Sequence, residues 1–202
     1  HRLRSQDVKR LRRVLVKTGA ERVAFTLDWS DATGGTYRKV MVFPNLPGVT
    51  WRNRVHEDVV DSLVEVGCRV VHLPFALSHV GAATEEARLA KMERNLRLLR
   101  LEETERPGDY LTAYHVAVCA MNLGQIETAR DLAARLIAHE AATVHGWLLA
   151  AKVARFSGDA TLGSRALLAM RAKAPDHPLT RLFVANEALK AAFDHAKKNN
   201  SA

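Results

Sequence analysis

The chain has 202 residues, of which 48% are hydrophobic and 26% charged, a composition typical of a folded globular protein. No apolar run approaches the roughly 18 residues of a membrane span, so the sequence excludes the transmembrane class. Cys68 and Cys119 lie far apart and lack metal-binding spacing. We therefore expect two reduced, buried thiols in a cytoplasmic protein.

The formal net charge is +8, which makes nucleic acid and anionic small molecules candidate partners. Much of the excess charge lies within the first 17 residues. That segment has two interpretations, a helix with a solvated basic face or an anion-binding segment. Aromatic residues make up 6% of the chain and do not interleave with these basic residues. The stacking platforms of single-strand binders are thus missing, and nucleic acid is disfavoured as a partner.

Residues 1–82 show the mixed patterning of an α/β region. We expect a helix over residues 5–18, strands over 22–29 and 39–43, and a short helix over 57–67. A Gly-rich turn separates the two strands. Residues 68–77 predict one or two further strands, in which Pro74 limits pairing to a sheet edge or a break.

From Thr84 onward the pattern predicts helices alone. Thr84 is a candidate N-cap, and Glu85 and Glu86 follow it in the first turn, where the helix dipole favours acids. This helix is expected to run to about residue 105 and to connect the α/β region with the rest of the chain.

Residues 109–202 contain an internal repeat. Its two copies align Gly124 with Gly158, a separation of 34 residues. A helix–turn–helix period of this length is the tetratricopeptide signature. We expect the two repeats to rest on the preceding helix and on a closing helix over 180–196, because two repeats alone are below the usual stable minimum.

The expected fold class is therefore α/β, a partial mixed sheet with helices, followed by an all-α region of tetratricopeptide-like repeats. The expected boundaries are residues 1–82 for the α/β part, 83–108 for the connecting helix and 109–202 for the repeats.

Three stretches resemble the C-terminal half of family 2 glycosyltransferases with a GT-A-type fold: "YRKVMVFPNLPGVTWRNRVHEDVVDSL", "LSHVG" and "KMERNLRLLRLEETERPGD". The resemblance is to the bacterial branch that carries tetratricopeptide-like repeats behind the catalytic domain, and it covers about residues 20–110. Its motifs are F-x-N-x-x-G-V, V-H-E, H-x-G and K-x-x-R-N-x-x-L-L. The matching residues are Phe43, Asn45, Gly48, Val49, Val55, His56, Glu57, His79, Gly81, Lys91, Arg94, Asn95, Leu98 and Leu99.

This resemblance implies an enzyme that transfers a sugar, with inversion, from a nucleotide-diphosphate sugar to an acceptor of the peptide or protein class. The helical repeats would select that acceptor. A divalent metal, Mn²⁺ or Mg²⁺, would assist at the diphosphate. The alternative is a tetratricopeptide-like scaffold that binds proteins without catalysis.

The acidic D-x-D motif that holds the metal in this family is missing from the chain. Asp28 and Asp31 have the spacing D-x-x-D, and we interpret them as turn residues. Since His1 leads straight into a helix, the resemblance suggests that the chain begins after the D-x-D half. We therefore expect no catalysis by these residues alone, and one face or edge of the sheet should be bare apolar surface.

Two acids and one histidine are the candidate reactive groups. Glu57 and Asp58 are candidate catalytic carboxylates, because an inverting transfer needs a base for the acceptor's proton. The alternative is that both acids only satisfy the dipole of the short helix. The resemblance implies a metal-binding role for His79, which is otherwise a structural histidine.

Three further residues are candidates for binding the donor or acceptor. His56 would orient Glu57 or close the acceptor pocket. Trp51 would stack on a sugar or acceptor, or else is a half-buried core residue. Arg38 would offset the charge of the diphosphate, or else is a surface residue.

Overall fold

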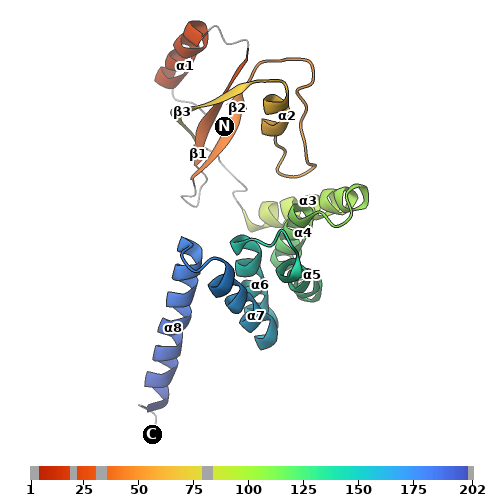
Figure 1. Ribbon diagram of the computed structural model, residues 1–202, viewed down its shortest axis with the longest axis vertical. Helices are drawn as coiled ribbons and strands as arrows, with labels where there is room; N and C mark the ends of the chain where they lie inside the picture. The colour runs from red at the N-terminus through yellow and green to blue at the C-terminus, as the bar shows by residue number, and fades with distance from the viewer. Residues whose placement is uncertain (1–4, 19–21, 31–35, 79–83, 200–202) are drawn as a thin grey trace. The chain divides into compact units, whose positions relative to one another are not determined.

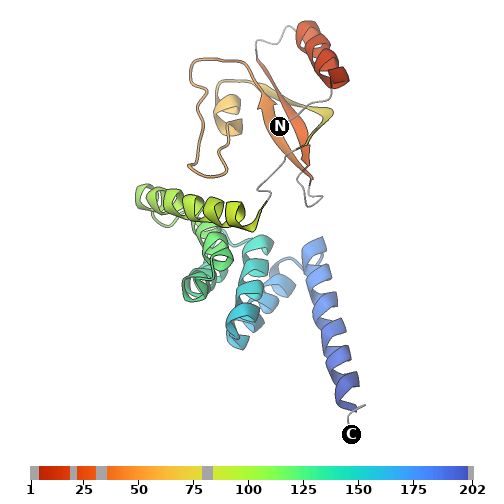
Figure 2. The ribbon, with the colours of Figure 1, turned by 180° about the vertical axis from the view of Figure 1, so that it is seen from behind.

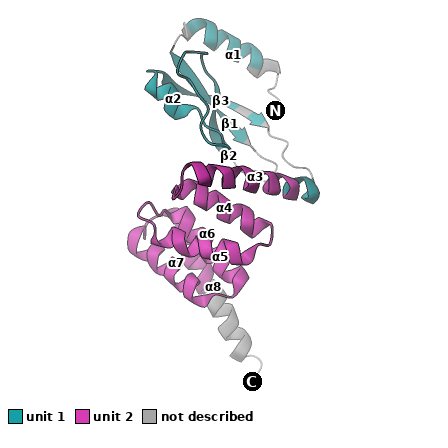
Figure 3. Cartoon of the chain, turned by 90° about the vertical axis from the view of Figure 1, so that its right-hand side faces the viewer, with its two compact units in different colours: residues 1–88 teal, residues 89–202 magenta. Residues whose placement is uncertain are grey.

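The structure is a computed structural model that describes residues 5–18, 22–30, 36–78 and 84–199 (Figure 1). It divides into two compact units, His1–Arg88 and Leu89–Ala202 (Figure 3). The described residues form a three-stranded mixed sheet and eight helices, so the fold class is mixed α/β. None of the helices in these ranges combines the length and the apolar character that crossing a bilayer requires.

The sheet of the first unit has β1 (Val23–Ser30) at its centre. β2 (Thr36–Val42) pairs with β1 in the antiparallel direction, and β3 (Arg69–Ser78) pairs with it in the parallel direction. Residues 69–78 thus form one strand at a sheet edge, which confirms the position predicted from Pro74.

One face of the sheet is covered by α1 (Ser5–Thr18), the helix predicted over these residues. Its Leu11, Val14 and Leu15 pack against a buried cluster. The members of that cluster are Phe25, Leu27, Leu73, Phe75 and Leu77. The basic residues of α1 are exposed, as on an amphipathic surface helix, and the guanidinium of Arg10 lies 5.6 Å from the centre of the Phe75 ring.

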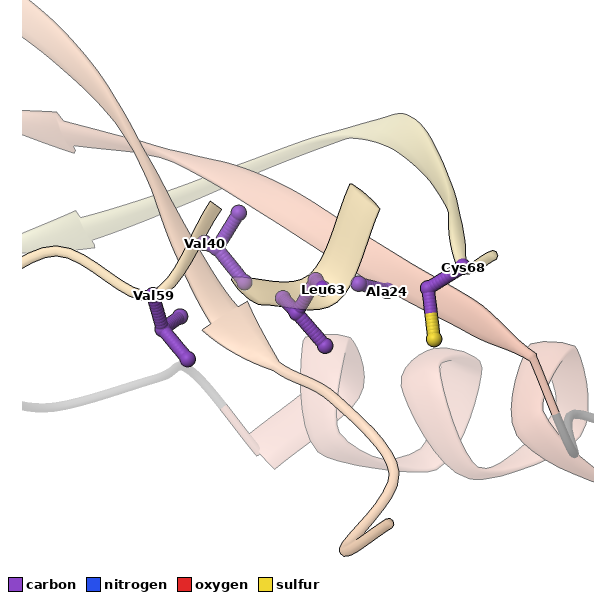
Figure 4. Packing of buried hydrophobic residues seen from close by; sticks show 5 residues of the cluster. All are labelled: Ala24, Val40, Val59, Leu63 and Cys68. Atoms are coloured by element: carbon purple, nitrogen blue, oxygen red, sulfur yellow. The ribbon is translucent and has the colours of Figure 1, made fainter. Parts of the chain in front are cut away.

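The opposite face of the sheet is covered by α2 (Val60–Glu65) and the residue before it. Val59 and Leu63 pack against Ala24, Val40 and Cys68, as Figure 4 shows. Figures 1 and 2 show α1 and α2 on opposite sides of the sheet. Within the described residues the expectation of bare apolar surface is therefore wrong for the two faces of the sheet, because helices cover both. The expectation also named an edge, and β2 and β3 form the two edges of the sheet.

The second unit starts within α3 (Glu85–Glu105). The backbone N–H of Ala87 donates to Thr84 Oγ1 at 3.2 Å, which confirms Thr84 as the N-cap. Leu96 and Leu99 on the same helix are buried, so α3 packs into the unit by one face.

The remaining helices are regularly spaced. They are α4 (Tyr110–Asn122), α5 (Ile126–Ala138), α6 (Val144–Ser157), α7 (Ala160–Lys173) and α8 (Pro178–Asn199). The first residues of α4, α6 and α8 are 34 apart (144 minus 110, 178 minus 144), and those of α5 and α7 are too (160 minus 126). Each helix from α4 to α7 packs on the next (Figure 2).

Glycines end the first helix of each pair at the same left-handed backbone angle. Gly124 follows α4 with φ +73°, and Gly158 follows α6 with φ +73°. L residues with a side chain rarely adopt this angle, which explains why glycine recurs at the same point of the repeat. The 34-residue period in the sequence is therefore a repeat of helix, turn and helix.

Candidate functional site

A bridged loop between β2 and α2 carries four of the candidate residues. Arg52 and Asp58 pair across it by two backbone hydrogen bonds, Arg52 N to Asp58 O at 2.7 Å and Asp58 N to Arg52 O at 3.0 Å. The intervening residues 53–57 form the tip of the loop and include the predicted V-H-E motif. We call residues 50–58 the bridged loop.

Side chains of α2 fix the bridged loop in place. The fully buried Ser62 Oγ donates to Thr50 O at 2.8 Å and accepts from Thr50 N at 3.0 Å. Arg52 donates through one nitrogen to both carboxylate oxygens of Glu65, at 2.6 and 2.7 Å. The hydrogen bond to Glu65, followed by the charge of that carboxylate, raises the pKa of Arg52. The loop is therefore held at both of its ends before any ligand binds.

The tip of the loop contains two residues in a costly backbone conformation. Asn53 has φ +65° and His56 has φ +59°, in the left-handed region that residues other than glycine seldom occupy. Val55 between them is buried and anchors the tip to the core. Such strain is tolerated where the surrounding contacts impose it, and it is concentrated at functional sites.

The two candidate carboxylates have different environments. Asp58 Oδ1 accepts from the backbone N–H groups of Val59, the N-cap residue of α2, at 2.7 Å and of Val60 at 3.1 Å, so this carboxylate is tied to the start of the helix. Glu57 is exposed, and its carboxylate makes no hydrogen bond or ion pair with any residue in the described ranges. The prediction that α2 begins at residue 57 is wrong, because the bridge holds residues 52 and 58 in extended pairing.

Trp51 lies on the surface next to the bridge. Its side chain is 56% exposed, so the alternative of a half-buried core tryptophan is disfavoured. The ring meets Phe43 edge to face, with 5.7 Å between ring centroids, and this contact fixes its orientation. His56, which is also exposed, stays a candidate for orienting Glu57. His79 lies outside the described residues.

Arg38 belongs to a second group of polar side chains, on the sheet itself. Its Nε lies 3.3 Å from Asp28 Oδ1, and Asp28 Oδ2 lies 3.6 Å from His72 Nε2. The other ring nitrogen, His72 Nδ1, lies 3.2 Å from Thr26 Oγ1. These four residues, which we call the sheet cluster, come from all three strands.

The sheet cluster corrects one interpretation and adds a residue that sequence reasoning missed. Asp28 was interpreted as a turn residue, but it lies in β1 and pairs with Arg38 on one side and Ala76 on the other. His72 was not a candidate. A histidine inside the apolar run "VVHLPF" was the signal for it, since such a position buries a polar ring unless a partner faces it. Asp31 lies outside the described residues.

Irregular strand pairing flanks the sheet cluster. The β1–β2 register shifts between Phe25 and Thr26, and the β1–β3 register shifts between Leu27 and Asp28. Bulges of this kind turn individual side chains and are frequent beside active sites. Because of the shift in the β1–β3 pair, Asp28 pairs with Ala76, whereas His72 pairs with Thr26.

The residue that follows the bridged loop and Asp28 of the sheet cluster lie toward the same end of the sheet. Figure 4 shows Val59, the residue after Asp58, toward the arrowheads of β1 and β3, with Cys68 at the opposite end. Asp28 is close to the carboxyl end of β1. Ligands of open α/β sheets bind outside the carboxyl ends of the strands, so this end is the candidate functional site.

The described residues do not provide a three-ligand site for the divalent metal that the resemblance implies. No group of three or more His, Cys, Asp or Glu side chains converges there. The structure gives no basis for a reaction step through that metal.

Removing the Ser62 hydroxyl is expected to destabilise the first unit by about 0.5–1.5 kcal/mol, because Ser62→Ala removes its hydrogen bonds to the N–H and C=O of the exposed residue Thr50. Chemical denaturation measures the change in the free energy of unfolding. The matched control is Ser164→Ala on α7, an exposed serine for which a change within about 0.5 kcal/mol is expected. Equal effects of the two substitutions would show that Ser62 does not fix the loop.

Comparison of the sequence with protein-family models found no match, and a search of curated proteins found none either. The function is therefore argued from the site and from the residues that resemble family 2 glycosyltransferases.

Proposed function

We propose that the chain is part of an inverting glycosyltransferase that moves a sugar from a nucleotide-diphosphate sugar to a peptide or protein acceptor. The observation that carries the proposal is the bridged loop. It presents the exposed carboxylate of Glu57 and the exposed ring of Trp51 on one anchored segment. An exposed carboxylate and an exposed aromatic ring on one short loop suit a carbohydrate, which offers hydroxyl groups and an apolar ring face.

In the proposed reaction Glu57 is the general base. Its carboxylate takes the proton of the acceptor's nucleophile while that atom forms a bond to the anomeric carbon of the sugar. The bond from the anomeric carbon to the diphosphate oxygen breaks, and its electron pair leaves with the nucleoside diphosphate. A fixed loop favours this step, because a base that is held in position before the reaction loses little entropy on reaching the transition state.

The surroundings distinguish Glu57 from Asp58. The carboxylate of Asp58 already accepts two backbone hydrogen bonds at the start of α2. Proton transfer to it would weaken these two hydrogen bonds, so we assign the base to Glu57 and a structural role to Asp58. Trp51 would stack on the sugar or acceptor, and His56 would orient Glu57.

Fewer of the described residues support binding of the nucleotide-diphosphate donor than support the roles of Glu57 and Trp51. A divalent ion, Mn²⁺ or Mg²⁺, stays part of it, although the described residues supply no three-ligand site for that ion. Arg38 is 67% exposed and already faces Asp28, so its charge toward a diphosphate is partly offset.

The helices from α4 to α8 are proposed to bind the acceptor, since their 34-residue period is that of tetratricopeptide-like repeats. A cavity between α6, α7 and α8 is lined by Phe156, Leu167 and Phe183. Phe156 is 67% exposed, so its ring is accessible to a partner at this cavity. The same observation favours the second candidate function, a protein-interaction scaffold without catalysis.

A transfer assay separates the two functions. The protein encoded by the complete gene is incubated with a panel of nucleotide-diphosphate sugars, Mn²⁺ and candidate peptide acceptors, and product is detected by mass spectrometry and by nucleoside diphosphate release. We expect transfer by the full-length protein and none by the 202-residue chain alone. Peptide binding without any sugar transfer by the full-length protein would favour the scaffold.

A further inference from the structure

We propose that Asp28 and His72 form a binding site for a divalent first-row transition-metal ion on the sheet of the first unit. The two residues come from neighbouring parallel strands and direct Oδ2 and Nε2 toward each other. They are distinct from His79 and from any D-x-D motif. The inference does not depend on the transferase activity, because it concerns ion binding by the chain itself.

The distance between the two atoms favours an ion over a hydrogen bond. Asp28 Oδ2 and His72 Nε2 are 3.6 Å apart. That is longer than the roughly 2.7–3.2 Å of an N–H···O hydrogen bond. Nitrogen and oxygen ligands lie about 2.0–2.2 Å from a bound ion, which places two ligands of a tetrahedral ion about 3.4 Å apart. An ion between the two atoms therefore needs only a small inward shift of the side chains.

The outer contacts of both residues are those that metal ligands need. Thr26 Oγ1 lies 3.2 Å from His72 Nδ1 and can accept its N–H, which leaves the lone pair on Nε2. Arg38 Nε donates to Asp28 Oδ1 at 3.3 Å, which leaves Oδ2 as the free oxygen. Each ligand is thus oriented by a partner on its far side, the usual arrangement around metal-binding histidine and carboxylate.

The same contacts disfavour a role in acid–base catalysis. Both ring nitrogens of His72 face atoms of the protein, so neither is directed at a substrate. An ion can enter between Nε2 and Oδ2, because the side chains of His72 and Asp28 are 31% and 29% exposed. Water or an anionic ligand would complete the coordination, since two protein ligands leave positions open.

The ligand types select the class of ion. One imidazole and one carboxylate suit Zn²⁺, Co²⁺ or Mn²⁺, whereas Ca²⁺ and Mg²⁺ prefer oxygen ligands alone. Protons compete with the ion for both residues, so binding is expected to weaken as the pH falls.

The test is a titration of the purified chain with Zn²⁺ by calorimetry and with Co²⁺ by visible absorption. We expect one site that is lost in Asp28→Asn and in His72→Gln. Thr26→Val is expected to bind about tenfold more weakly, because it removes the partner that orients the imidazole. Thermal melting confirms that each variant is folded, and Asp28→Asn is isosteric with the parent.

The matched control is His145→Gln. His145 and His177 form a histidine pair in the second unit, with 6.4 Å between their ring centroids, and so offer imidazole nitrogens away from the proposed site. We expect this variant to bind like the parent. Retention of the site in folded Asp28→Asn, or its loss in His145→Gln, would overturn the proposal. Neither result would bear on the transfer assay, which is carried out independently.

Discussion

Replacing Glu57 by Gln in the full-length protein is expected to slow sugar transfer by about 10²- to 10⁴-fold, the usual contribution of a positioned general base. Glutamine keeps the size of the side chain but cannot take the acceptor's proton. The value of kcat should therefore fall while the affinity for nucleoside diphosphate stays nearly unchanged. Steady-state kinetics and calorimetric titration with a nucleoside diphosphate measure the two quantities.

Two further variants make this experiment specific to Glu57. Glu140→Gln removes an exposed carboxylate from the second unit and should keep the parental rate. Asp58→Ala should lower stability by about 0.5–2 kcal/mol, because it removes the oxygen that accepts from the N–H groups of Val59 and Val60, with a smaller effect on the rate. A folded Glu57→Gln variant with the parental kcat would remove Glu57 from the mechanism.

Truncating Phe25 to Ala is expected to lower the free energy of unfolding of the first unit by about 3–5 kcal/mol. Phe25 is 1% exposed at the centre of the sheet, where it packs with Leu27, Leu73 and the α1 side chains. The substitution leaves a cavity between α1 and β1 that the sheet cannot close. Hydrogen exchange of the β1 amides and chemical denaturation measure the loss.

Phe156→Ala is the matched control for this substitution. The Phe156 ring is 67% exposed in the second unit, so its removal should cost under about 1 kcal/mol. A small effect of Phe25→Ala would mean that α1 does not hold the face of the sheet that it covers.

The sequence predicts elements best where the signals are local. The helix over residues 5–18 and the N-cap at Thr84 depend on residues within a few turns of one another, and the 34-residue repeat is visible because the same local pattern recurs along the chain. Gly124 and Gly158 mark the repeat because one backbone angle requires glycine at both places. These features are all present in the structure.

Features that depend on distant pairing were missed or misplaced. Asp28 follows an apolar run and precedes a Gly-rich stretch, a context typical of a turn, yet β2 and β3 pair with it from both sides. Asp28 and His72 face each other only because β1 and β3 pair in one particular register. No local sequence pattern predicts that register. Similarly, α2 starts at Val60 and not at the predicted residue 57, because the backbone of Asp58 pairs with that of Arg52.

The candidate site shows the same division. Exposure of Glu57 and Trp51 agrees with their proposed roles, and the hydrogen bonds of Asp58 at the start of α2 agree with the alternative that this acid serves the short helix. The loop contacts that fix both residues, through Ser62 and Arg52, are made between segments about ten residues apart. Nothing in the sequence around Ser62 or Arg52 indicates that these two residues hold the bridged loop in place.

The parallel pairing of β1 with β3 also sets the order in which the two units can fold. Thr26 and His72 are neighbours in the sheet but 46 positions apart along the chain. A long loop must close before any contact of that pair forms, and this slows the search. The helices from α4 to α7 each pack on the next in sequence, so they can assemble by short steps. During synthesis on the ribosome, the first unit is thus the slower to close although it emerges first.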